Sequence, residues 1–177
     1  MKISKQQLID MKACEDVLER FIEQTNNTDE LVDVLSLIGG KNTVYDLVWL
    51  AGETLPKEKL VRFVCDLALI NIEKIKLYTE KYDLIVEFLM NPTADSVAIY
   101  AAIYAVYAAR VTADDAANAA AARVALYAAA DADAVYAADD ADTVYAALYA
   151  TAAAVRAGAT QDQIDVQLVK MFDGDNL

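Results

Sequence analysis

The chain has 177 residues, which is enough for one compact domain or for two small ones that share an interface. Its 28 acidic and 15 basic residues give a net charge of −13, and it contains no histidine. This balance argues against direct binding to a nucleic-acid backbone, which needs clustered Lys and Arg, and it fits a partner with a basic surface. The lack of histidine removes the usual general base and the commonest metal ligand.

Helix-capping residues divide the first part of the chain into amphipathic helices. Ser4 and Gln7 predict a capping box, and apolar residues then follow at helical spacing as far as Asn26. Thr28 is expected to open a short helix. Gly39 is expected to end it, because glycine adopts the left-handed conformation at little cost.

Three further helices are expected before residue 93. One begins at Thr43 and extends to Gly52, and the next follows Pro56, because the first turn of a helix tolerates proline. The third spans Ile72–Met90. No segment of this half alternates with a period of two over more than a few residues, so we predict no sheet.

Residues 93–177 are rich in Ala, Tyr and Asp and contain a nine-residue repeat. Copies begin at Ala98, Ala125, Ala134 and Thr143. Nine residues rotate a helix by about 900°, so one straight helix would place successive tyrosines on opposite faces. Because Asp and Thr gather between copies and favour helix caps, we predict short, closely packed helices. Gly158 and Thr160 then separate these from a last helix, Gln161–Phe172.

The predicted fold is therefore all-α, with a helical region at 1–92 and a repeat region at 93–177 that are either separate or one continuous domain. Cys14 and Cys65 lie within apolar helical stripes and are expected to be buried free thiols. The N-terminus lacks the apolar core of a signal peptide, and the longest apolar run, 97–109, is too short to span a bilayer. We expect a cytoplasmic protein.

Aspartates of the repeat region form the first candidate site. They are Asp114, Asp115, Asp131, Asp133, Asp139, Asp140 and Asp142. Carboxylates in rows on a rigid helical scaffold imitate nucleic-acid phosphates and would fit the basic groove of a DNA- or RNA-binding protein. The alternative is that they cap helices and keep an Ala-rich surface in solution. The clusters lack the glycine and glutamate of a calcium loop, so we predict no metal site and no cofactor.

Tyrosines and arginines of the same region form an alternative site. Tyr rings stack on bases and Arg binds phosphate, so a pocket of both would hold a nucleotide-like ligand. Its residues would be Tyr100, Tyr104, Tyr127, Tyr136, Tyr145, Arg110, Arg123 and Arg156. Otherwise the tyrosines pack in the core and the arginines pair with nearby Asp. A third possibility is that the Ala-rich faces drive homo-oligomerisation.

The sequence carries no Ser-His or Cys-His arrangement, no P-loop and no dinucleotide fingerprint, so we predict a protein that is not an enzyme. The segment 11–15 (MKACE), followed by Phe21 and by the A-x-x-A-A tract, resembles the Ala-rich, immunity-protein-like accessory proteins of tailed phages. This resemblance implies a phage or bacterial origin and a protective or counter-defence role, such as inhibition of a host defence protein. It transfers no binding residue.

Overall fold

A computed structural model of the chain describes residues 1–92 and 140–173. This part is mostly helical and has one small sheet, which confirms the all-α class. The elements in chain order are β1 (Lys2–Ile3), α1 (Lys5–Asp10), α2 (Glu15–Thr25), β2 (Val32–Asp33), the 3-10 helix η1 (Val34–Leu37), α3 (Val44–Thr54), α4 (Lys57–Ile70), the 3-10 helix η2 (Ile72–Tyr78), α5 (Tyr82–Met90), α8 (Asp140–Arg156) and α9 (Gln161–Phe172).

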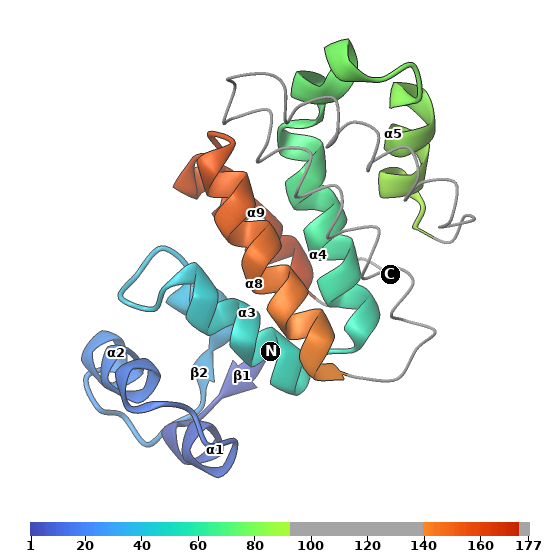
Figure 1. Ribbon diagram of the computed structural model, residues 1–177. Helices are drawn as coiled ribbons and strands as arrows, with labels where there is room; N and C mark the ends of the chain where they lie inside the picture. Colours follow the sequence, from blue (N-terminus) through green and yellow to red (C-terminus); the bar gives the residue numbers. More distant parts are fainter. Residues whose placement is uncertain (93–139, 174–177) are drawn as a thin grey trace.

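Four helices make the centre of the molecule. Helices α8 and α9 come from the C-terminal part of the sequence, and both pack against α3 and α4 (Figure 1). Helices α1 and α2 and the sheet lie at one end of this group, while η2 and α5 lie beside α4 at the other. One continuous hydrophobic core contains residues from both sequence regions.

Alanines form the buried face of α8. Ala147, Ala150 and Ala154 are fully buried in that face, and their small side chains let the helix lie close to its neighbours. On α3, a Cβ atom at Gly52 would lie 2.2 Å from Val144 Cγ2, so this position has no room for a side chain unless Val144 moves. The close packing predicted for the Ala-rich region is therefore present along α8.

Capping residues set several helix boundaries where the sequence predicts them. Ser4, Thr43 and Thr160 each make a capping box, and the last helix spans the predicted residues 161–172. Asn26 ends α2 in the left-handed conformation, and Pro56 directly precedes α4. These predictions are confirmed because each rests on a local hydrogen bond or backbone preference that distant packing did not override.

The single helix predicted to begin after Ser4 is in fact two helices. Lys12 has a φ of 60°, and this left-handed conformation interrupts the helix between α1 and α2. As a result Cys14 lies at the start of α2 and is exposed, so the prediction of a buried thiol is wrong for Cys14 and confirmed for Cys65.

The prediction of no sheet is also wrong. Lys2 and Ile3 pair in antiparallel register with Asp33 and Val32. Strands of two residues are too short to show an alternating pattern, and the segment from Thr28 that was expected to be a helix contains one of them. The helix predicted from residue 72 to residue 90 is likewise divided into η2 and α5.

Replacing Ala150 with Leu tests the alanine face. The added methyl groups have no space between α8 and its neighbours, and overpacking of this kind typically costs about 1 to 3 kcal/mol. Ala152→Leu, at a partly exposed position of the same helix, is the matched control and should change stability far less. Urea denaturation measures both; equal losses in the two variants would contradict the packing described here.

Candidate functional site

Most of the site residues predicted from the sequence lie outside the described residues. These are Asp114, Asp115, Asp131, Asp133, Asp139, Tyr100, Tyr104, Tyr127, Tyr136, Arg110 and Arg123. Asp140 and Asp142 fall in the first turn of α8. Tyr145 and Arg156 are both exposed on α8, but they are eleven residues apart and therefore separated by about 16 Å of helix axis.

An acidic surface is nevertheless present on α2. We name the exposed residues Glu15, Asp16, Glu19 and Glu23 the acidic face of α2. At about 100° per residue, the four side chains fall within an arc of about 100°. Lys41 lies 3.9 Å from Glu23, and the other three acids form no ion pair with a described residue. The sequence signal for this face is the spacing of three and four residues between its acids. Sequence reasoning missed it because the aspartates are far more concentrated in the repeat region.

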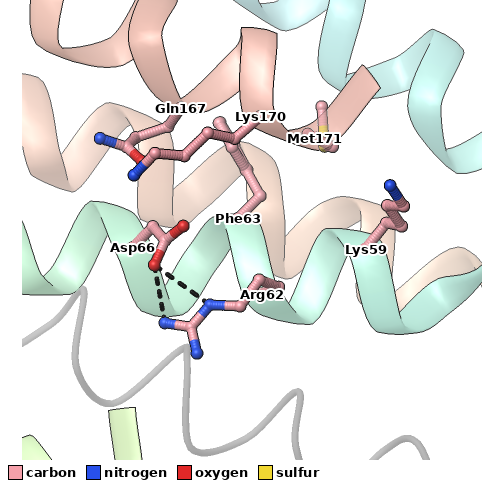
Figure 2. Close-up of a pocket in the computed structure, with 7 residues that line it drawn as sticks. All are labelled: Lys59, Arg62, Phe63, Asp66, Gln167, Lys170 and Met171. Atoms are coloured by element: carbon pink, nitrogen blue, oxygen red, sulfur yellow. Dashed lines mark hydrogen bonds and ion pairs between the residues drawn. The ribbon is translucent and has the colours of Figure 1, made fainter. Parts of the chain in front are cut away.

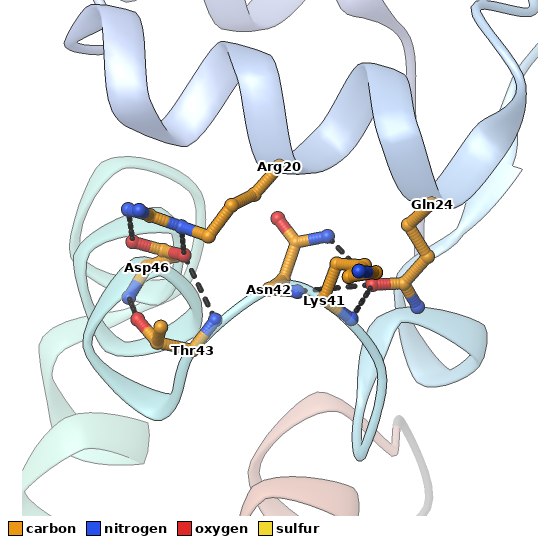
Figure 3. Close-up of polar contacts among 6 residues, drawn as sticks. All are labelled: Arg20, Gln24, Lys41, Asn42, Thr43 and Asp46. Carbon is orange, nitrogen blue, oxygen red and sulfur yellow. Dashed lines mark hydrogen bonds and ion pairs between the residues drawn. The ribbon is translucent and has the colours of Figure 1, made fainter.

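The neighbouring face of α2 carries a cation that is used inside the molecule. Arg20 donates to Asp46 through Nε (2.7 Å to Oδ2) and Nη2 (2.8 Å to Oδ1), as Figure 3 shows. The hydrogen bond to Asp46 raises the pKa of Arg20 above its ordinary value. Asp46 also accepts from the backbone N–H of Thr43 in the capping box, so this pair fastens α2 to the start of α3.

Gln24 fixes the loop that precedes α3. Its Oε1 accepts from the backbone N–H groups of Lys41 and Asn42 and from the side chain of Asn42, at 2.7 to 3.0 Å (Figure 3). Its Nε2 donates to the carbonyl of Ser36 at 2.9 Å. The N–H groups of Gly40, Lys41 and Asn42 are thus already bonded within the protein, and these bonds hold the loop against α2 and η1.

Cations of α4 and η2 are bound to the C-terminal ends of other helices. Lys59 Nζ donates to the carbonyl of Asp173 at the end of α9 (2.8 Å), and Lys74 donates to the carbonyl of Ala157 just after α8. Arg62 donates to the last two carbonyls of α5, those of residues 89 (2.6 Å) and 90 (3.0 Å). The last carbonyls of a helix lack partners and carry partial negative charge, so each cation satisfies one helix end.

A pocket of about 300 Å³ lies between α4 and α9. We call it the α4/α9 pocket; Figure 2 shows its lining residues, Lys59, Arg62, Phe63, Asp66, Gln167, Lys170 and Met171. Asp66 accepts two hydrogen bonds from Arg62, at 2.7 and 3.1 Å. Lys170 Nζ donates to Gln167 Oε1 at 3.0 Å. Sequence reasoning missed this pocket because its two walls are about a hundred residues apart and no motif links them.

Tyr82, at the start of α5, forms a small cluster with η2. Its hydroxyl donates to Glu73, and Lys76 lies 5.0 Å from the centre of its ring and 3.7 Å from Glu73. The hydrogen bond to Glu73, with a smaller contribution from burial, raises the pKa of Tyr82 to about 12.

No protein-family model, curated protein or solved structure matches the chain. The resemblance to phage accessory proteins therefore stays a prediction. Among residues 1–92 and 140–173, no three His, Cys, Asp or Glu side chains are grouped so that they would hold a metal ion. Within the same ranges, no helix combines the length and the apolar character that crossing a membrane requires.

Replacing Arg20 with Leu should lower the free energy of unfolding by about 1 to 3 kcal/mol, because Asp46 is then left buried without its cation. Asp46→Asn in the same chain should recover part of this loss, since the uncompensated charge is gone. Urea denaturation of both single variants and of the double variant gives the coupling energy. Strictly additive losses would show that the pair does not hold α2 to α3.

Tyr82→Phe tests the contact with Glu73 through pH. The folded pKa is raised above that of the unfolded chain, so the contribution to stability is complete below about pH 10 and is lost as pH rises toward about 12. The stability difference between wild type and Tyr82→Phe should therefore shrink across this range in urea denaturation. Tyr45→Phe, at an exposed tyrosine of α3, is the control. A difference that does not vary with pH would refute the contact.

Proposed function

We propose that the protein is a non-enzymatic binding protein whose exposed carboxylates dock onto a basic-surfaced macromolecule, and that it inhibits a nucleic-acid-binding host or defence protein in this way. The observation that supports it most is the division of charge. Arg20 pairs with the buried Asp46, and Lys59, Arg62 and Lys74 bond to helix ends, whereas the acidic face of α2 is turned to solvent. A net charge of −13 gives this arrangement a long-range field that attracts a basic partner.

The spacing of charges on α2 supports the imitation of a nucleic acid. The four carboxylates extend from residue 15 to residue 23, which is about 12 Å of helix axis. The three intervals between these charges average about 4 Å, comparable to the spacing of about 3.4 Å between phosphates along a single DNA strand. The Arg20–Asp46 pair holds α2 against α3, so the helix that carries the four carboxylates is already fixed in position. Binding therefore costs little conformational entropy of the backbone.

From the resemblance to phage accessory proteins we infer that the protein acts in the cytoplasm of a bacterial host. There the partner would be a protein whose nucleic-acid groove is lined by Lys and Arg. Occupation of that groove by the acidic face of α2, together with the aspartates of the repeat region, would exclude the natural ligand by competition.

Two variants of equal charge test the role of α2. In the first, Glu15, Glu19 and Glu23 become Gln and Asp16 becomes Asn; in the second, the exposed residues Glu53, Glu80, Glu87 and Asp83 are changed in the same way. Each set removes four negative charges, so the net charge changes from −13 to −9 in both. The wild type, the first variant and the second variant are each immobilised and incubated with a bacterial lysate.

We expect the wild type and the second variant to retain the same basic protein, and the first variant to lose it. Duplex DNA should displace the retained protein, and raising the salt from about 0.1 M to about 1 M should release it, because the screening length falls from about 10 Å to about 3 Å. Equal retention by both variants, or retention that DNA does not compete with, would contradict the proposal.

A further inference from the structure

The α4/α9 pocket carries a charge opposite to that of the protein as a whole. Three of its lining residues are cations and one is an acid, in a chain with a net charge of −13. Asp66 is already bound by Arg62 through two hydrogen bonds. The ammonium groups of Lys59 and Lys170 are therefore the uncompensated charges of the pocket.

Neutral oxygens are the only acceptors of these two lysines in the described part of the chain. Lys59 donates to a backbone carbonyl and Lys170 to an amide oxygen, and neither has a carboxylate within 4 Å there. Lys59 is only 9% exposed. The end of α9 gives Lys59 only a partial negative charge and Gln167 gives Lys170 none, so an anion that enters the pocket would supply the missing counter-charge.

The floor of the pocket is apolar. Phe63 and Met171 are 2% and 3% exposed, and the amide of Gln167 lies beside Lys170 (Figure 2). A volume of about 300 Å³ is at the lower end of the range for small-molecule sites. A cation beside an apolar floor selects a ligand that has both a charged and an apolar part.

We propose that the α4/α9 pocket binds a small organic anion, a carboxylate or phosphate group attached to an apolar body. The charged group bonds to Lys170, and the apolar body contacts Phe63 and Met171. A polyanion such as nucleic acid is disfavoured by the overall charge of −13, whereas a small ligand adds only one or two charges to it. This site is separate from the acidic face of α2 and does not depend on the function proposed above.

Three probes separate the contributions of charge and apolar contact: phenyl phosphate, inorganic phosphate and phenol. The readout is the NMR signal of methionine methyl groups labelled with ¹³C, of which the chain has four. Met171→Leu assigns the signal of the pocket and conserves volume. We expect phenyl phosphate to shift the Met171 signal in a saturable way and to leave that of Met11, in the segment between α1 and α2, unchanged. Phosphate or phenol alone should bind much more weakly.

Lys170→Gln then tests the cation. Lys170 is exposed and holds no helix end, so this variant should fold as the wild type does, whereas Lys59 is avoided because it caps α9. Loss of a charge-assisted hydrogen bond should weaken phenyl phosphate binding about tenfold. Lys2→Gln, at an exposed lysine of β1, removes the same charge outside the pocket and should leave binding unchanged.

Three results would overturn the proposal. They are a Met171 signal that phenyl phosphate does not move, phenol binding as tightly as phenyl phosphate, and equal affinities in Lys170→Gln and wild type. Because the readout is local to the pocket, none of these results bears on capture of a basic protein by α2.

Discussion

Close packing of α8 against α3 and α4 is the contact on which the rest of the structure depends. Alanines form the buried face of α8, and the absence of a side chain at Gly52 lets α3 approach it. Alanine buries little apolar area, so the larger part of the hydrophobic stabilisation comes from fully buried side chains such as Leu47, Phe63 and Leu67. The alanines contribute mainly by bringing these larger side chains within contact of α8 and α9.

This arrangement also explains why three cations of α4 and η2 bond to helix ends. When α8 and α9 pack beside α4, and α5 follows it, three helices end close to cations of α4 and η2. Lys59, Arg62 and Lys74 bond to the carbonyls of those ends, which are otherwise without partners. These three positive charges thereby stabilise the packed helix ends, whereas the four carboxylates of the acidic face of α2 are exposed. Fold stability and surface electrostatics thus follow from the same packing.

Local signals in the sequence predicted what local interactions determine. The capping boxes at Ser4, Thr43 and Thr160 each need only residues three apart, and the sequence contains both partners. The break at Lys12 carries no such signal, because a lysine in the left-handed conformation is imposed by the packing of α1 against α2. Ile3 pairs with Val32, nearly thirty residues away in the sequence. The periodicity of a short segment gives no information on such a distant contact. The same reason hides the α4/α9 pocket, since its two walls, α4 and α9, lie side by side only in the folded chain.

The two electrostatic features of the molecule act over different distances. The net charge acts over about a screening length, roughly 8 Å at physiological ionic strength, and so governs encounter with large charged partners. The lysines of the α4/α9 pocket act at hydrogen-bond distance and beside an apolar floor, where water is partly excluded and charge interactions are stronger. A small anion that reaches the pocket therefore meets local cations, although the protein as a whole repels it. One acidic chain can in this way combine the two proposed activities, attraction of a basic macromolecule by its surface charge and binding of a small anion by local cations of the α4/α9 pocket.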